Sequence, residues 1–347
     1  MRKRAFLSLI LAASMLMAAC SSGTEQKGTE TAATTTSAET EAAEQTGNSE
    51  TETADAENSG EYPEIKVGII TLNLEAQYWL DTVAGLESVV EPRGGSVTLY
   101  SSENDAQKAI QQVEDMITKQ FDAIVLTCID KEGLRPALQQ AHDAGIPVVV
   151  YDKATNDTDL VYTQIQTNDY NIGYYLAENL AEALDYKGKV MCVNTPSVSV
   201  QGRVSGFTDC IAQYPDMELI TGEAATALAD ATLPVVESLL QKDPDIVGWL
   251  GINETQSVGA LSAIEGAQAE NVKVFSLEPS KTMRGFMKEG KVDCLVDQQP
   301  YVMGTMIGEA CYSAVAGETM DPAVEVPYGI VWPEDLEEYE ANLKEAE

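Results

Sequence analysis

The stretch IPVVVYDKA (146–154) joins a short apolar run to two opposite charges. Three valines and a tyrosine after Pro147 have the length and branching of a buried β-strand. Asp152 and Lys153 follow at its carboxyl end. Charges commonly mark the point where a strand reaches water, but open α/β sheets also bind their ligands at the carboxyl ends of parallel strands. This stretch alone is compatible with both interpretations.

The chain around this strand alternates β-rich runs with amphipathic segments. Three strand-like runs each precede a helical pattern: IKVGIIT precedes 77–91, SVTLYS precedes 106–119 and FDAIVLTC precedes 131–143. Alternating strands and helices predict a parallel sheet that is covered by helices on both faces.

The same pattern then occurs a second time. GKVMCVNT (188–195) is similar to the first strand, DIVGWLGIN (245–253) to DAIVLTCID (122–130), and VKVFSLEP (272–279) to IPVVVYDK. This repeat predicts an α/β chain with two similar, doubly wound parallel-sheet lobes that face each other across a cleft. Asp152 in the first unit corresponds to Glu278 in the second, and this equivalence favours a ligand-binding role for both acids.

Residues 1–20 have the pattern of a secretory signal. Three basic residues precede an apolar run, and small residues lead to Cys20. A cysteine at this point resembles the lipobox of bacterial lipoproteins and predicts lipidation of Cys20; the alternative is an ordinary signal with a chance cysteine. Residues 21–61 are rich in Ser, Thr, Ala and Glu, which predicts a disordered acidic tether. We therefore expect the folded part to be lipid-anchored at the extracytoplasmic face of a bacterial cell membrane.

Composition argues against several other classes of protein. The formal net charge of −35 argues against nucleic-acid binding, which depends on Lys and Arg. The single histidine, His142, argues against a histidine-based catalytic triad or metal cluster, and no phosphate-binding or nucleophile-elbow motif is present. We expect no cofactor and no metal. Asp152 and Glu278 acting as the acid and base of a glycosidase is the enzyme alternative.

Two further features of the chain bear on its class. A sugar-responsive transcriptional regulator would need a basic helix-turn-helix ahead of its lobes, where this chain has a signal and an acidic tether. Five cysteines besides Cys20 form no CxxC pair and lie partly in apolar runs, which favours buried free thiols over disulfides.

Over about residues 64–330 the chain resembles the periplasmic sugar-binding proteins of the ribose/galactose type, the solute-binding subunits of ABC importers. The resemblance rests on the order and spacing of the blocks TLNLEAQYW, AGIPVVVYD, QGRVSGF, GINETQSVGAL, VFSLEP and VDQQPYVMG. It implies the type I periplasmic-binding-protein fold and a monomer that delivers a sugar or sugar-like molecule to an ABC transporter permease. A surface sensor that presents a sugar-like signal to a receptor is the alternative.

The resemblance also implies where the lobes begin and end. The chain is expected to cross between lobes near Thr167, Gln298 and Pro327, and these three crossings form a hinge that closes over the ligand. The N-terminal lobe is then 62–167 plus 298–326, and the C-terminal lobe is 168–297 plus 327–347.

Eight positions match ligand-binding residues of the family. Tyr78 and Trp79 match an aromatic pair that stacks on a sugar ring, although Trp79 also fits the apolar stripe of its helix. Asp152 matches an aspartate that accepts sugar hydroxyls, since a carboxylate takes two donors at once. Lys153 stands where ribose binders have arginine, and it either contacts the ligand or pairs with Asp152.

The remaining four positions lie further along the chain. Arg203 and Gln298 match a ligand-binding arginine and a glutamine beside the hinge. Asn253 matches a family asparagine, but asparagine is also a favoured helix N-cap. Glu278 replaces the usual aspartate. Ala76 and Cys128 stand where ribose binders have asparagines, so the resemblance identifies the family and leaves the sugar open.

Overall fold

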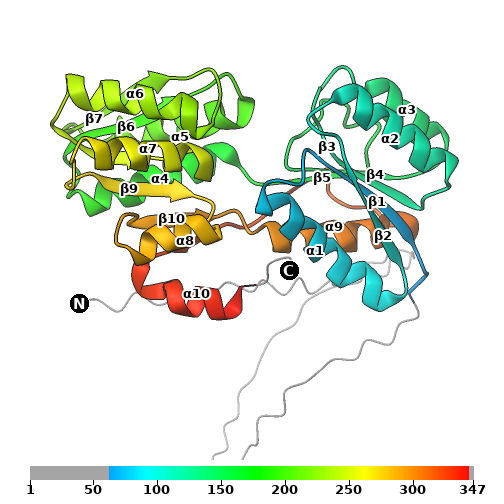
Figure 1. Cartoon of the computed structure of the whole chain (residues 1–347). Helices are drawn as coiled ribbons and strands as arrows, with labels where there is room; N and C mark the ends of the chain where they lie inside the picture. Colours follow the sequence, from blue (N-terminus) through cyan, green and yellow to red (C-terminus); the bar gives the residue numbers. More distant parts are fainter. Residues whose placement is uncertain (1–61, 344–347) are drawn as a thin grey trace, which may run out of the picture. The chain divides into compact units, whose positions relative to one another are not determined.

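The computed structural model describes residues 62–343, so the predicted signal, Cys20 and the tether lie outside it. Within the described residues the chain forms two six-stranded sheets of matching strand order (Figure 1). The first has the order β11-β5-β4-β3-β1-β2, with β1 (Lys66–Thr71), β2 (Ser96–Ser101), β3 (Ala123–Thr127), β4 (Val148–Tyr151), β5 (Thr163–Gln166) and β11 (Ala323–Glu325). All of its neighbouring pairs are parallel.

The second sheet repeats this arrangement with one difference. Its order is β12-β10-β9-β8-β6-β7, with β6 (Gly188–Asn194), β7 (Met217–Glu223), β8 (Ile246–Leu250), β9 (Lys273–Leu277), β10 (Cys294–Asp297) and β12 (Gly329–Val331). The edge strand β12 pairs antiparallel with β10, while the other pairs are parallel. The repeat in the sequence therefore corresponds to a repeat of topology, and the predicted fold class is confirmed.

The chain passes three times between the two sheets. It leaves the first sheet after β5, returns after β10, and enters the second sheet again between β11 and β12. Most strands are followed by a helix. The helices are α1 (Gln77–Val90), α2 (Ala106–Thr118), α3 (Arg135–Asp143), α4 (Asp169–Ala183), α5 (Val198–Ile211), α6 (Ala229–Lys242), α7 (Glu254–Gly266), α8 (Lys281–Lys288), α9 (Pro300–Val315) and α10 (Leu336–Asn342), with 3₁₀ turns at Glu91–Arg93 and Pro333–Asp335.

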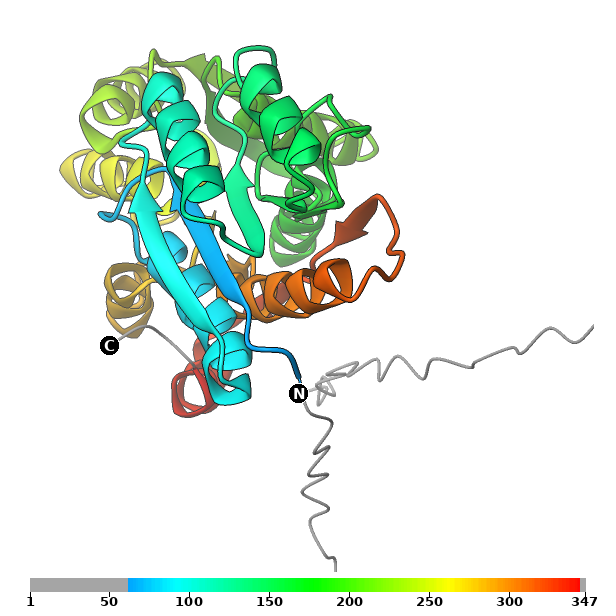
Figure 2. The ribbon, with the colours of Figure 1, turned by 90° about the vertical axis from the view of Figure 1, so that its right-hand side faces the viewer.

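Each sheet has a hydrophobic core on both faces. Along β3, Ala123 and Val125 pack with residues of α1 and α9, whereas Ile124 and Leu126 pack with residues of α2 and α3. This alternation follows from the two-residue period of a strand, and it explains why these strands read as continuous apolar runs. Figure 2 shows β1 and β2 side by side in this first sheet. The second sheet has matching cores against α4 and α5 and against α6, α7 and α8.

Glycines allow one helix pair in each half to pack closely. A Cβ atom on Gly85 of α1 would clash with the carbonyl oxygen of Tyr301, and one on Gly304 of α9 with that of Thr82. Helices α4 and α5 meet in the same way, because a Cβ on Gly173 would clash with the carbonyl of Arg203. Backbones approach this closely only where a side chain is missing.

Helix α3 begins later than its sequence pattern predicts. The expected start was residue 131, but the helix begins at Arg135. Asp130 Oδ1 accepts hydrogen bonds from the backbone N–H groups of Glu132 and Gly133, which holds residues 131–134 in a turn. Among the residues that the model describes, no helix is long and apolar enough to span a membrane.

Candidate functional site

Asp152 and Glu278 follow the carboxyl ends of β4 and β9, the fourth strand of each sheet in chain order. Both have a left-handed backbone, with φ of 58° and 65°. The N–H of Asp152 donates to the carbonyl of Ile165, and that of Glu278 donates to the carbonyl of Val296, at 3.0 and 2.9 Å. Each acid is thus turned out of its strand while its own backbone stays bonded to the neighbouring strand. Non-glycine residues rarely adopt this conformation, and such strain is concentrated at functional sites.

Tyr78 and Trp79, at the start of α1, have different surroundings. The half-buried Tyr78 donates its hydroxyl proton to Asp152 Oδ1 at 3.0 Å. Burial raises the pKa of Tyr78 well above its usual value, and the Asp152 charge acts in the same direction, so the phenol stays protonated. Trp79 is 7% exposed and belongs to the core, where it packs edge-on against Tyr78 and Tyr151.

Arg203 is a buried cation on α5 whose three nitrogens all have protein partners. Nε donates to Asp169 Oδ1 at 2.8 Å, Nη1 to the carbonyl of Ile252 at 2.5 Å, and Nη2 to Gln298 Oε1 at 3.2 Å. Burial alone would lower the pKa of Arg203, but the carboxylates of Asp169, Glu278 and Asp152 outweigh it and raise the pKa. A guanidinium has five N–H donors, so two remain after these three bonds.

Gln298 connects Arg203 to the segment between β5 and α4. Its Nε2 donates to Thr167 Oγ1 at 3.1 Å, and its Oε1 accepts from Arg203. Gln298, Thr167 and Arg203 are 2%, 7% and 7% exposed. Thr167 follows β5 and Gln298 follows β10, so this buried network joins two of the three passages between the sheets.

Asn253 caps α7 beside Glu278. Its Oδ1 accepts from the N–H of Gln256 at 2.9 Å, as an N-cap side chain does. The first N–H of the helix, that of Glu254, donates to Glu278 Oε2 at 3.0 Å. In this structure Asn253 is therefore a helix N-cap, as the alternative interpretation expected. The bond from Glu254 places the Glu278 carboxylate at the N-terminus of α7, where a negative charge is stabilised.

The charges of this region act on one another. Burial raises the pKa of the Asp152 carboxyl; Asp169 adds to this shift, whereas Lys153, Tyr78 and Arg203 oppose it. Burial also raises the pKa of the Glu278 carboxyl, against the opposing effects of Arg203 and the Glu254 N–H. Asp152, Arg203 and Glu278 therefore form one electrostatic cluster, although they come from both sheets.

The structure thus brings most of the predicted site residues together. Contacts or charge interactions link six of them, namely Tyr78, Asp152, Lys153, Arg203, Glu278 and Gln298. Asn253 adjoins this group through the next residue, Glu254, whose N–H donates to Glu278. Trp79 joins this group only through its ring contact with Tyr78. Two further residues belong to the same network: Thr167, which was expected only as a crossing between lobes, and Asp169, which the sequence analysis did not name. Their only signal in the sequence is their place directly after a strand and at the start of a helix.

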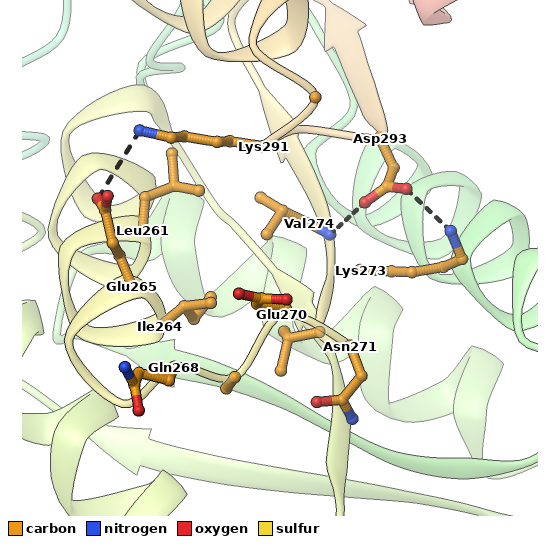
Figure 3. Close-up of a pocket in the computed structure, with 13 residues that line it drawn as sticks. Leu261, Ile264, Glu265, Gln268, Glu270, Asn271, Lys273, Val274, Lys291 and Asp293 are labelled. Carbon is orange, nitrogen blue, oxygen red and sulfur yellow. Dashed lines mark hydrogen bonds and ion pairs between the residues drawn. The ribbon is translucent and has the colours of Figure 1, made fainter.

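A hollow lies away from these residues, on the second half of the chain. It has a volume of about 620 Å³ and is lined by the end of α7, the start of β9 and the segment before β10 (Figure 3). Its lysines are already paired, Lys291 with Glu265 and Lys273 with Asp293. It lies at the amino end of β9, whereas Glu278 follows the carboxyl end, so it is separate from the candidate site. In residues 62–343 no group of three or more His, Cys, Asp or Glu side chains is arranged to hold a metal ion.

The strand order, the repeated acids and the buried network occur in a chain whose residues 67–319 match the model of the periplasmic binding protein domain. The chain belongs to this family. It is 27% identical, over 276 residues, to the ribose import binding protein RbsB of Bacillus subtilis. This alignment covers 79% of this chain and 89% of that protein. It is 26% identical to the D-apiose import binding protein of Actinobacillus succinogenes, over 65% of this chain and 73% of that protein.

The comparison with solved structures agrees with the sequence comparison. The periplasmic solute-binding protein of an Actinobacillus succinogenes ABC transporter, determined with bound D-allose, superposes with a TM-score of 0.74 at 24% identity. The alignment covers 80% of this chain and all of that one. The periplasmic binding proteins are thus both the sequence relatives and the structural neighbours of this protein.

Proposed function

We propose that this protein captures a sugar or sugar-like small molecule between its two sheets and delivers it to an ABC importer. The observation that carries the proposal is the pair Asp152 and Glu278, which occupy equivalent strand ends and both interact electrostatically with Arg203. Carboxylates that can each accept two hydroxyl donors suit a polyhydroxylated ligand. The relatives named for ribose and D-apiose import support the same conclusion.

Each predicted site residue has a role in this proposal. Asp152, Glu278 and the spare N–H groups of Arg203 bind ligand hydroxyls, and Lys153, Asn253 and Gln298 add polar contacts at the edges. Tyr78 presents its ring to the sugar while its hydroxyl stays on Asp152. Trp79 does not contact the ligand but supports the Tyr78 ring from the core, where it packs against Tyr78 and Tyr151. The site binds its ligand without converting it, so sugars incubated with the protein are recovered unchanged.

We propose that residues 62–167 plus 298–326 and residues 168–297 plus 327–347 move as two lobes. The passages at Thr167, Gln298 and Pro327 act as the hinge. A ligand favours the closed form only by its higher affinity for that form. Small-angle scattering is expected to show a smaller radius of gyration at ligand saturation, and an unchanged radius contradicts binding between the lobes.

We also propose that the mature protein begins at Cys20, carries a lipid there, and works as a monomer at the extracytoplasmic face of the cell membrane. The basic start, the apolar run and the small residues before Cys20 support this part of the proposal. A Cys20→Ala chain is expected to be soluble or unprocessed. Recovery of that variant in the membrane, processed like the parent, contradicts the lipid anchor.

A thermal-shift panel tests the binding function directly. The purified full chain is heated with D-ribose, D-allose, D-apiose, D-galactose, xylitol, myo-inositol and a set of nucleosides. A compound that binds only the folded state raises Tm, by an amount that grows with its concentration relative to Kd. We expect at least one sugar or polyol to raise Tm at millimolar concentration. A panel without any shift contradicts the proposed function.

A further inference from the structure

The backbone of Asp152 is fixed on both sides, but its side chain has a single hydrogen-bond donor. The N–H of Asp152 donates to the carbonyl of Ile165 at 3.0 Å, and that of Lys153 donates to the carbonyl of Tyr151 at 2.7 Å. Within residues 62–343 the carboxylate accepts one hydrogen bond, from the Tyr78 hydroxyl to Oδ1 at 3.0 Å. Lys153 forms no ion pair in this range, so it does not hold the carboxylate. Tyr78 is thus the group that orients the Asp152 side chain.

Tyr78 is itself held by a rigid element. It lies in the first turn of α1, and its ring packs edge-on against Trp79 with 4.9 Å between the ring centroids. Helix α1 is fixed in turn, because Gly85 packs directly against the backbone of α9. Met303 Sδ on α9 lies 3.6 Å from the Tyr78 hydroxyl oxygen, but a thioether is a weak acceptor. The hydroxyl proton is therefore directed to Asp152.

The same bond favours the charged form of Asp152. Burial raises the pKa of the Asp152 carboxyl, and the hydrogen bond from Tyr78 is one of the interactions that oppose this shift. Burial also raises the pKa of the Tyr78 phenol well above its usual value, so Tyr78 remains a donor wherever the carboxylate is ionised. The other groups that interact with the Asp152 charge are Lys153, Tyr151, Arg203, Asp169 and Glu278.

We propose that Tyr78 is a positioning residue of the binding site, whose hydroxyl fixes Asp152 Oδ1 and leaves Oδ2 as the acceptor for a ligand hydroxyl. The inference rests on the proposed function and gives Tyr78 a second role, besides the contact of its ring with the sugar. The hydroxyl acts through Asp152 and does not contact the ligand. Because the carboxylate is oriented before the ligand arrives, binding does not have to order it.

Tyr78→Phe tests the hydroxyl separately from the ring. The variant keeps the ring beside Trp79 but leaves the Asp152 carboxylate without its donor. Calorimetry with the full chain uses the compound that raises Tm most in the thermal-shift panel. At pH 8 the variant is expected to bind this compound about tenfold more weakly, which is the size of the contribution of one hydrogen bond.

The pH profile distinguishes a positioning role from a merely structural one. The affinity of the wild type should fall as pH falls through the Asp152 pKa, because a protonated carboxyl loses acceptor capacity. The Tyr78 hydrogen bond lowers that pKa, so in Tyr78→Phe the fall should begin at a higher pH. The affinity ratio of wild type to variant is therefore expected to grow as pH is lowered from 8, until the wild type weakens as well.

Tyr100→Phe is the matched control, since the Tyr100 hydroxyl on β2 donates to a different carboxylate, Asp115 Oδ2, at 3.1 Å. This variant is expected to keep the affinity and the pH profile of the wild type. A double-mutant cycle measures the bond of Tyr78 without any ligand, by urea unfolding at pH 8. Tyr78→Phe should lower the urea midpoint more in the wild type than in Asp152→Asn, where the hydroxyl meets no charge.

The outcomes separate this inference from the proposed function. Wild-type affinity at pH 8 in folded Tyr78→Phe protein overturns the inference and leaves the proposed function intact. An affinity loss that is the same at every pH, or an equal change of midpoint in both backgrounds, overturns it as well. If no compound of the panel binds, the proposed function fails. The cycle then still decides the inference, because coupling supports the positioning of Asp152 by Tyr78 and its absence overturns it.

Discussion

Asp152 and Glu278 share one backbone geometry in two different sheets. Each follows the fourth strand of its sheet, has a left-handed φ near 60°, and donates its N–H to the carbonyl of the neighbouring strand. A left-handed non-glycine residue reduces the stability of the fold by on the order of 1–3 kcal/mol. Two such residues at equivalent positions therefore lower stability twice, which selection for stability alone does not explain. What the conformation does is to turn a carboxylate out of the end of the strand.

Neutralising these two carboxylates is expected to remove ligand binding while the fold is kept. In Asp152→Asn and Glu278→Gln the shape is preserved, and asparagine tolerates the left-handed backbone. Each charged hydrogen bond contributes about 1.5–3 kcal/mol, so the loss of one or two bonds weakens binding by roughly tenfold to a thousandfold or more. Calorimetry with the tightest-binding sugar of the thermal-shift panel measures this loss.

The control for this experiment is an acid of the same backbone conformation outside the site. Asp185 has φ of 52° and is exposed, and its only ion pair in the described residues is with Lys187 at 3.8 Å. Asp185→Asn is expected to bind like the wild type. Wild-type affinity in both carboxylate variants as well would leave Asp152 and Glu278 as ordinary strand ends.

The same two substitutions are expected to stabilise the ligand-free protein at neutral and higher pH. Burial raises the pKa of Asp152 and of Glu278 in the folded state, so both groups favour folding when protonated and lose that contribution as pH rises through the raised values. The neutral amides do not ionise. The variants should therefore be more stable than the wild type at pH 8, and the difference should shrink as pH falls toward the usual carboxyl range.

Urea unfolding of the ligand-free chain at several pH values measures this dependence. Asp115→Asn is a control of opposite sign, because the hydrogen bond from Lys119 lowers the pKa of Asp115. Its wild-type carboxylate favours folding above the usual pKa, so the substitution should destabilise slightly at pH 8 and less in acid. A wild-type protein that is more stable than both site variants at pH 8 contradicts the expectation.

The sequence predicts the fold well because each strand and helix has a recognisable pattern of apolar residues within its own segment. β-branched runs such as VVVY and AIVLT are buried on both faces, and their repetition in the second half predicts a second sheet of the same order. The place where the pattern fails is local as well. Asp130 holds a turn that delays α3, and an Asp-to-backbone contact leaves no mark in hydrophobic periodicity.

The site is predicted less completely, since its network depends on contacts between distant segments. Asp152 and Glu278 stand out because they end equivalent strands. Nothing in the sequence shows that Asp169 pairs with Arg203 or that Thr167 orients Gln298, because each contact joins separate elements. The aromatic pair illustrates the same limit. Tyr78 and Trp79 are neighbours, and only their packing shows that Tyr78 reaches Asp152 while Trp79 lies in the core.

Close helix packing should make Gly85 intolerant of a side chain. Gly85→Ala places a Cβ against the backbone carbonyl of Tyr301 on α9, and neither backbone can move without shifting a helix. We expect destabilisation by about 1–3 kcal/mol, as for other overpacked sites. Gly285→Ala in α8 is the matched control, because a Cβ there meets no atom within 4 Å. Removing a helical glycine without a clash should stabilise by about 0.5–1 kcal/mol. Equal effects at both positions would contradict the packing argument.

Thiol counting tests the buried cysteines and the lipid anchor together. Cys128, Cys192, Cys210, Cys294 and Cys311 are free and buried. Burial raises the pKa of Cys192 and Cys311 to about 12 and that of Cys210 to about 11, so the reactive thiolate is scarce at pH 8. The native protein should therefore react slowly with a thiol reagent at pH 8. If Cys20 carries the proposed lipid, the protein purified from membranes and unfolded in urea should release only these five thiols, because the lipid would block the sixth. A sixth thiol in that sample contradicts lipidation, and fewer than five indicates a disulfide that the described residues do not contain. The same chain made without its signal and beginning at Cys20 is the control, since it should release all six.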